Sequence, residues 1–276
     1  MTGLAIGCMW NAEELRRSIC GLSSRDLFED TKSIVPGFVD WMVVGHMAAF
    51  KEDSAKLQQL ISCYPLSDTR IHVLIYNMKK RSPLVITNYT YAATTTNADT
   101  NAVLIKAKDS GTLARSIMAS CAIPAVIFPV KVFRKSISKY VDGGVYAPSP
   151  VGLMIHGGYL HVGENSRFIY FLPSIGGAVS ALRFLQIIYS KMDADVNKEL
   201  DTIVMEFRRL GCNQERTFDN LAEAVSVYNV SSPVLMLIRP VFDPAWYRFD
   251  ILNFSSKALC HIVDHEFKYH ISVLTR

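Results

Sequence analysis

The sequence lacks the patterns that mark several large classes of protein. Its six cysteines form no C-x-x-C pair and mostly lie in apolar stretches, which favours free thiols in a reducing compartment. The apolar runs 117–130 and 168–182 are shorter than the roughly 18–20 residues that a membrane-spanning helix needs. The chain has no internal repeats, and its apolar start carries no basic segment, so we expect no signal peptide.

Charge is also sparse. Charged residues make up 20% of the 276 residues, and the formal net charge is +4. The short basic runs at 79–81, 134–135 and 208–209 do not form the stripe expected of a nucleic-acid-binding protein. We therefore expect no nucleic-acid partner. We interpret the mild excess as a solvated surface, with contact to an anionic membrane as the alternative.

Apolar residues, by contrast, are abundant. They make up 50% of the chain, which is enough to bury a large core. The length suits one domain over residues 1–276, with a motif-bearing part at 3–151 and a C-terminal part of helices and strands at 152–276.

Hydrophobic periodicity predicts alternating strands and helices. We expect strands at 71–76, 84–89, 101–105, 126–133, 137–141, 168–172 and 234–238. We expect helices at 8–22, 112–119, 178–190, 196–210 and 255–269. This order predicts an α/β fold with three layers, α/β/α, around a largely parallel central sheet.

Two segments carry the most specific pattern. The first, 114–124, reads Ala-Arg-Ser-Ile-Met-Ala-Ser-Cys-Ala-Ile-Pro, and the second, 140–145, reads Tyr-Val-Asp-Gly-Gly-Val. Asp142 ends an apolar strand, and Gly143 and Gly144 permit a tight turn with positive φ and a close backbone approach. Such a turn presents a carboxylate at the carboxyl end of a strand, where α/β proteins hold active sites. An ordinary Asp-Gly turn is the alternative.

Together these segments resemble the patatin-like phospholipase family. In that family a helix ends in Ala-Ser-x-Ala-Ile-Pro, a strand pair follows, and Asp-Gly-Gly or Asp-Gly-Ala comes next. The loop 146–151 also resembles the family's loop after the aspartate. The resemblance implies that Asp142 is the base of a serine–aspartate dyad, with Gly143 and Gly144 as its turn. It implies cleavage of phospholipid or other lipid esters through an acylated serine, with no metal or organic cofactor.

The family's serine lies in G-x-S-x-G, on a sharp turn from a strand into a helix. The fitting stretch is Gly3-Leu4-Ala5-Ile6-Gly7, so Gly3 and Gly7 match the turn glycines and Ala5 occupies the position of the nucleophile. Removing the serine from comparable hydrolases lowers the rate by about 10⁶. We therefore predict negligible serine-dependent esterase activity. The alternative is that the Gly3 match is accidental.

The family's glycine-rich oxyanion segment and its elbow strand do not precede Gly3. We therefore expect the patatin-like fold to be N-terminally incomplete, unless the start site is misassigned or the sheet is rearranged. Two other interpretations stay open. One is a non-catalytic lipid-binding or regulatory relative, which Ala5 favours directly, and the other is an interaction protein on an unrelated α/β fold.

The expected ligand is a lipid or phospholipid acyl ester. His261 and His265 share one face of the predicted last helix and could ligate a metal, but they do not form an H-E-x-x-H motif. We interpret them as a polar helix face and expect neither a metal nor a cofactor. We expect a cytoplasmic protein that meets membranes or lipid droplets peripherally.

Overall fold

The computed structural model describes residues 11–21, 69–90, 103–122, 124, 127–172, 183–241 and 268–276. The chain forms two compact units, one made of 1–150 with 251–265 and the other of 151–250 with 266–276. We call them unit 1 and unit 2. The expectation of a single domain over 1–276 stays a prediction.

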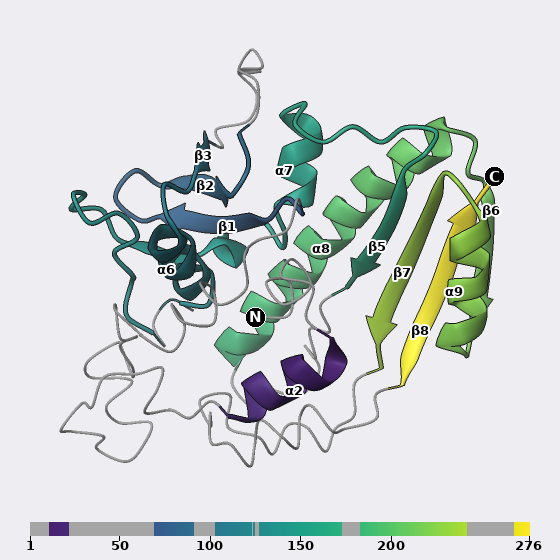
Figure 1. The fold of residues 1–276 in the computed structure, drawn as a ribbon, viewed down its shortest axis with the longest axis horizontal. Helices are drawn as coiled ribbons and strands as arrows, with labels where there is room; N and C mark the ends of the chain where they lie inside the picture. Colours follow the sequence, from purple (N-terminus) through teal and green to yellow (C-terminus); the bar gives the residue numbers. More distant parts are fainter. Residues whose placement is uncertain are drawn as a thin grey trace. The chain divides into compact units, whose positions relative to one another are not determined.

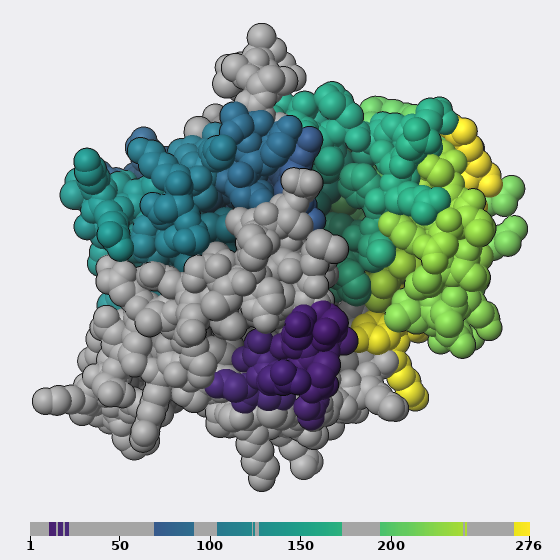
Figure 2. All heavy atoms as spheres, in the orientation of Figure 1, coloured from purple at the N-terminus to yellow at the C-terminus, as the bar shows by residue number. Residues whose placement is uncertain are grey.

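Unit 1 contains a four-stranded sheet in the order β3-β2-β1-β4, of which Figure 1 labels β1, β2 and β3. Its strands are β1 (His72–Asn77), β2 (Ser82–Thr87), β3 (Val103–Lys106) and β4 (Tyr140–Asp142). Its described helices are α2 (Ala12–Cys20) and α6 (Ser110–Ser120), followed after β4 by the short 3-10 helix η1 (Gly143–Val145). The described side chains of α2 are exposed or half-buried, and this helix forms part of the molecular surface (Figure 2).

The turn between β1 and β2 determines their direction. Met78–Arg81 link the two strands, so the chain reverses within four residues and the strands pair antiparallel. The Asn77 side chain stabilises the turn by accepting a hydrogen bond from the Lys80 N–H at 3.0 Å. Arg81 adopts φ 51°, as a residue in a tight turn can.

Helix α6 packs on this sheet through an almost wholly buried surface. The Asp109 carboxylate caps its first turn by accepting a hydrogen bond from the Thr112 N–H. Arg115 is 5% exposed, and its guanidinium donates to the Val132 carbonyl at 2.8 Å. Leu113, Ile117 and other apolar side chains of α6 join those of β1 and β2 in one core.

Unit 2 contains a second four-stranded sheet, in the order β5-β7-β8-β6. Its elements are α7 (Val151–His156), β5 (Arg167–Phe171), α8 (Arg183–Arg209), β6 (Gln214–Phe218), α9 (Leu221–Val230), β7 (Val234–Pro240) and β8 (Tyr269–Thr275). Side chains on the two faces of β7 alternate between two cores. Leu235 packs with residues of α8, whereas Val234, Met236 and Ile238 pack with residues of α9, so the two helices cover opposite faces (Figure 1).

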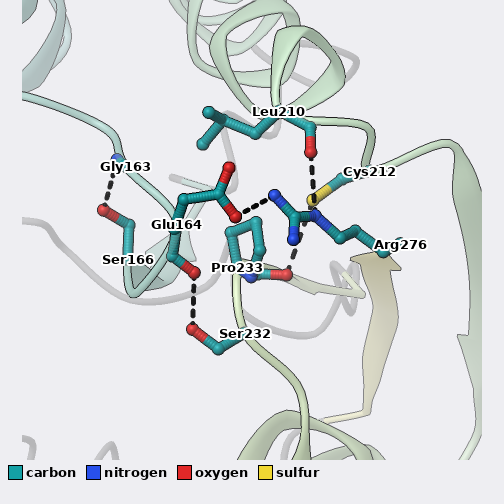
Figure 3. A network of polar contacts seen from close by, with 8 residues as sticks. All are labelled: Gly163, Glu164, Ser166, Leu210, Cys212, Ser232, Pro233 and Arg276. Atoms are coloured by element: carbon teal, nitrogen blue, oxygen red, sulfur yellow. Dashed lines mark hydrogen bonds and ion pairs between the residues drawn. The ribbon is translucent and has the colours of Figure 1, made fainter.

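A polar network joins the end of β8 to the loops around it (Figure 3). The Arg276 guanidinium donates to the Leu210 carbonyl at 2.9 Å, after the end of α8, and forms an ion pair with Glu164. The Glu164 carbonyl accepts a hydrogen bond from the Ser232 hydroxyl at 2.9 Å. The buried Cys212 thiol donates to the Pro233 carbonyl at 3.4 Å. These contacts hold together segments that lie far apart in the sequence.

The α/β class is confirmed, but the two described sheets are mixed rather than largely parallel. Parallel pairing occurs between β2 and β3 and between β5 and β7, whereas β1 pairs antiparallel with both neighbours and so does β8. The short turn at 78–81 imposes antiparallel pairing on β1 and β2, and apolar strand composition does not reveal such a turn.

Most strand and helix positions agree with the sequence, and the differences have physical reasons. The two helices predicted at 178–190 and 196–210 form one helix over its described range 183–209, because no glycine or proline lies between them. Strand β6 was not predicted because its segment, Gln-Glu-Arg-Thr-Phe, is polar and mostly exposed at a sheet edge. The last helix was predicted to reach residue 269, but Tyr269 begins β8, which is held between β7 and β6.

Candidate active site

A cavity of about 240 Å³ lies in unit 1 beside Asp142. Four segments line it: 71–74 at the start of β1, the last turns of α6, the Asp142 turn, and the loop 147–150. Most of the lining side chains are apolar. The two motifs separated in the sequence therefore form one cavity wall.

Two backbone contacts place Asp142 in this wall. Strand β4 pairs antiparallel with β1, with Asp142 opposite Ile75. The Asp142 N–H donates to the Ala122 carbonyl at 3.0 Å, just after the end of α6. At the end of α6, the Cys121 N–H donates to the Met118 carbonyl. The helix end and the strand end are thus joined directly, and the carboxylate lies where they meet.

Gly143 is required by close packing and not by its backbone angles. A Cβ added there would lie 2.4 Å from Leu74 Cγ and 2.6 Å from the Leu74 carbonyl oxygen. The positive φ predicted for the Asp-Gly-Gly turn is not found, since Gly158 and Gly211 are the glycines with positive φ in the described part. That part of the prediction was wrong, because η1 continues the chain in a right-handed 3-10 turn. The close backbone approach is confirmed.

Gly144 orients the carboxylate. Its N–H donates to Asp142 Oδ1 at 2.8 Å, which makes Asp142 the cap of η1. Within the part of the chain that the structure describes, only this oxygen of Asp142 has a hydrogen-bond partner. The second oxygen therefore remains able to accept a proton from a group in the cavity.

Burial raises the pKa of Asp142 above its ordinary value, and the hydrogen bond from Gly144 opposes this rise. A carboxylate with a raised pKa is a stronger base than one in water. Perturbed titration in a cavity is typical of functional groups, although structural carboxylates also show it. Once it is ionised, Asp142 can therefore serve as a base in the cavity.

Two further side chains from α6 and its end line the cavity, Ser120 and Cys121. The Cys121 thiol is free, and the residue is exposed. Loss of hydration raises the pKa of this thiol, and the negative charge of Asp142 acts in the same direction. At neutral pH Cys121 is therefore a neutral thiol rather than a reactive thiolate.

His72 also lines the cavity, and sequence reasoning did not single it out. Burial lowers the pKa of His72, and the positive charge of Arg70 lowers it further. Its imidazole is therefore neutral at physiological pH. The position of His72 at the start of an apolar strand carries no signal of a functional role, and only the fold brings it to Asp142.

The remaining predicted site residues cannot be compared with this geometry. Gly3, Ala5 and Gly7 lie outside the described residues, so the position of the missing nucleophile stays a prediction. His261 and His265 also lie outside them. The described ranges contain no group of three or more metal-ligating side chains and no helix long and apolar enough to cross a membrane.

Comparison with known proteins adds one finding to this geometry. A family described as patatin-like phospholipase matches residues 1–155, a range that includes every segment lining the cavity. No curated protein and no solved structure matches the chain. The family match covers more than half of the 276 residues and ends just after the Asp142 turn and its loop. The chain therefore belongs to the patatin-like phospholipase family.

Proposed function

We propose that this chain carries the site of a lipid acyl hydrolase, that its ester substrate binds in the cavity beside Asp142, and that Ala5 at the nucleophile position prevents hydrolysis. The observation that carries the proposal is the half-buried Asp142 carboxylate in the wall of a mostly apolar cavity. Membership of a phospholipase family supplies the class of ligand.

The size of the cavity restricts what it can hold. Pockets that enclose small molecules usually measure about 300–1,000 Å³. A cavity of about 240 Å³ is smaller, so it accommodates the ester group and a short stretch of acyl chain. Ile71, Leu74 and Ile117 supply apolar contacts for methylene groups, and Asp142 supplies the polar group near the ester. We therefore expect short acyl chains to fit best.

The proposed chemistry of this site, when a serine occupies the nucleophile position, is acyl transfer. Asp142 removes the proton from a serine hydroxyl, the serine oxygen attacks the ester carbonyl, and the alcohol leaves with a proton. Water then cleaves the acyl-serine with the same carboxylate as base. Ala5 has no oxygen to attack, so the first step cannot occur. Support for this position of Ala5 comes from the glycine pattern of the sequence.

Restoring the nucleophile tests the proposal. On a short-chain nitrophenyl ester, we expect the protein itself to show no serine-dependent turnover and Ala5→Ser to show a burst of nitrophenol. The double variant Ala5→Ser/Asp142→Asn should lose that burst, and Ala5→Gly serves as the matched control at the same position. A silent Ala5→Ser variant that is folded by circular dichroism would reject the dyad. Equal activity in all four proteins would show that another group cleaves the ester.

A non-catalytic lipid-binding or regulatory role is the second candidate. It is favoured by the combination of a retained cavity and an alanine at position 5. Under this proposal Ala5→Ser stays silent while binding of a short-chain ester persists, measured by calorimetry. We further propose a cytoplasmic location with peripheral membrane contact. Cys121 and Cys212 are free thiols, as a reducing compartment favours.

A further inference from the structure

Two basic loops meet at one end of the sheet in unit 1. The turn 78–81 follows β1, and the loop 131–139 precedes β4. Because Asn77 pairs with Tyr140, the last residue of β1 lies beside the first residue of β4. The two loops therefore extend from the same end of the sheet. We call the surface they form the basic face.

The basic face carries cations without acidic partners of its own. Its two loops contain seven basic residues and no acidic residue: Lys79, Lys80, Arg81, Lys131, Arg134, Lys135 and Lys139. All but Lys131, which is half-buried, are exposed. The described salt bridges involve none of the seven. The nearby carboxylate of Asp109 has its pKa lowered mainly by hydrogen bonds from Thr112 and to a smaller extent by Arg115 and Arg134.

The same surface exposes two large apolar side chains. Ile137 is 82% exposed and lies two residues from both Lys135 and Lys139, and Met78 is 50% exposed and directly precedes Lys79. Surface apolar residues are common singly, but here they lie among lysines and arginines. Apolar side chains surrounded by cations are typical of proteins that bind at the membrane interface.

The loop holds Ile137 outward. The Ser136 N–H donates to the Phe133 carbonyl at 3.0 Å, and the Ser138 N–H donates to the Ser136 hydroxyl at 3.0 Å. Phe133 packs edge-on against Tyr140 with ring centroids 5.8 Å apart. Ser138 is buried, so its neighbour Ile137 points away from the core. The exposure of Ile137 is therefore built into the turn.

We propose that the basic face binds the surface of an anionic membrane, with its cations near lipid phosphates and with Ile137 and Met78 entering the interface. Charge complementarity identifies an anionic partner. The two exposed apolar side chains favour a bilayer over a nucleic acid, because a phosphate backbone offers them no apolar partner. The inference rests on the proposed lipid function for its choice of partner, but membrane binding requires no ester cleavage.

The basic face and the cavity do not overlap. The cavity is lined by residues 71–74 at the start of β1, whereas the basic face begins at Met78, after its end. At about 3.3 Å per residue, Leu74 and Met78 lie about 13 Å apart along β1, and Asp142 and Lys139 about 10 Å apart along β4. Substitutions on the basic face therefore leave the cavity unchanged, which makes binding and catalysis separable.

Vesicle sedimentation with the full chain tests this proposal. We expect binding to vesicles of phosphatidylcholine with 30% phosphatidylserine and little binding to phosphatidylcholine alone, with a strong decrease at high salt. Each basic residue near an anionic membrane contributes about a fivefold gain in partitioning. Lys79→Gln/Lys80→Gln should therefore lower partitioning about 25-fold. Ile137→Ser should lower it at least tenfold, since it removes the inserted side chain.

The control removes the same charge elsewhere. Arg208 and Arg209 are an exposed basic pair at the end of α8 in unit 2. Arg208→Gln/Arg209→Gln should change partitioning less than twofold. An equal loss in both double variants, or binding that ignores phosphatidylserine, would overturn the proposal. So would duplex DNA that binds the protein more tightly than the vesicles and does not respond to Ile137→Ser.

A separate readout distinguishes this proposal from the hydrolase proposal. In the Ala5→Ser background, Lys79→Gln/Lys80→Gln should leave cleavage of a soluble nitrophenyl ester unchanged while vesicle binding falls. Vesicle binding by the protein with Ala5 in place succeeds or fails independently of any esterase activity. A loss of soluble-ester cleavage together with vesicle binding would show that the substitutions act through the fold, and would count against a dedicated membrane surface.

Discussion

Gly143→Ala should destabilise unit 1 because the added methyl group has no room. Its Cβ would lie 2.4 Å from Leu74 Cγ, 2.6 Å from the Leu74 carbonyl oxygen and 2.7 Å from the Leu74 carbonyl carbon. Carbon atoms in contact prefer about 3.5–4.0 Å, so η1 and β1 would have to separate by about 1 Å. The Leu74 side chain can rotate, but its carbonyl cannot move without β1.

The position of Leu74 makes such a shift costly. Leu74 is 5% exposed and pairs with Val85 in the middle of the β1–β2 hairpin. Overpacking a core costs about 1–3 kcal/mol, and backbone involvement places this site at the upper end. Replacing glycine by alanine returns about 0.4–1 kcal/mol, because the unfolded chain loses freedom. We therefore expect a net loss of about 2 kcal/mol in the free energy of unfolding.

Urea unfolding followed by circular dichroism measures this loss directly. In a thermal scan, about 2 kcal/mol corresponds to a Tm lower by about 4–8 °C for a chain of this size. Gly163→Ala is the matched control, because a Cβ at Gly163 would meet no atom within 4 Å. That variant should be as stable as the parent or slightly more stable. If Gly143→Ala were as stable as Gly163→Ala, the close approach to Leu74 would not exist, and the required glycine would have to be explained in another way.

Two further substitutions test the electrostatics of the fold. Because the pKa of Asp142 is raised, the folded protein binds the proton of this carboxyl group more tightly than the unfolded chain does. The free energy of unfolding therefore falls as the pH rises through the pKa of Asp142 in the folded protein. Asp142→Asn keeps an acceptor for the Gly144 N–H and should raise the urea midpoint of unfolding at pH 7. This gain in stability should become smaller toward pH 4. A gain that does not change with pH would contradict the proposed titration of Asp142. In unit 2, the buried Glu199 carboxylate accepts a hydrogen bond from the Gly152 N–H at 3.0 Å at the start of α7. Glu199→Ala should cost about 1–3 kcal/mol in urea unfolding and Glu199→Gln clearly less, whereas equal losses would show that the hydrogen bond contributes little.

Local patterns in the sequence were sufficient for the parts of the fold that depend on neighbouring residues. The strands β1, β2, β5 and β7 and the helix α6 were predicted within a few residues, because each is an apolar or periodic run bounded by turn residues. The edge strand β6 was missed because its residues are polar. No element was predicted for residues 270–276, and β8 forms there through its pairing with β7 and β6.

The candidate site shows the same division. The motif pattern identified Asp142 and its two glycines, and through the family it identified the class of ligand. The sequence contained no signal for His72, which reaches the cavity only because β1 pairs with β4. From the sequence alone, we interpreted the basic runs at 79–81 and 134–135 as parts of a solvated surface. The pairing of Asn77 with Tyr140 brings these two runs to the same end of the sheet in unit 1.

The sequence by itself determined that an acidic turn follows a strand and that a helix with a characteristic end precedes it, whereas the place of Ala5 at the family's serine position stays a prediction. Only the tertiary structure decided that the Asp142 N–H meets the Ala122 carbonyl and that Gly143 packs against Leu74. The physical reason is that these contacts join residues 20 to about 70 positions apart. Their formation depends on sheet register and on packing of the whole unit, and no local run of residues encodes either.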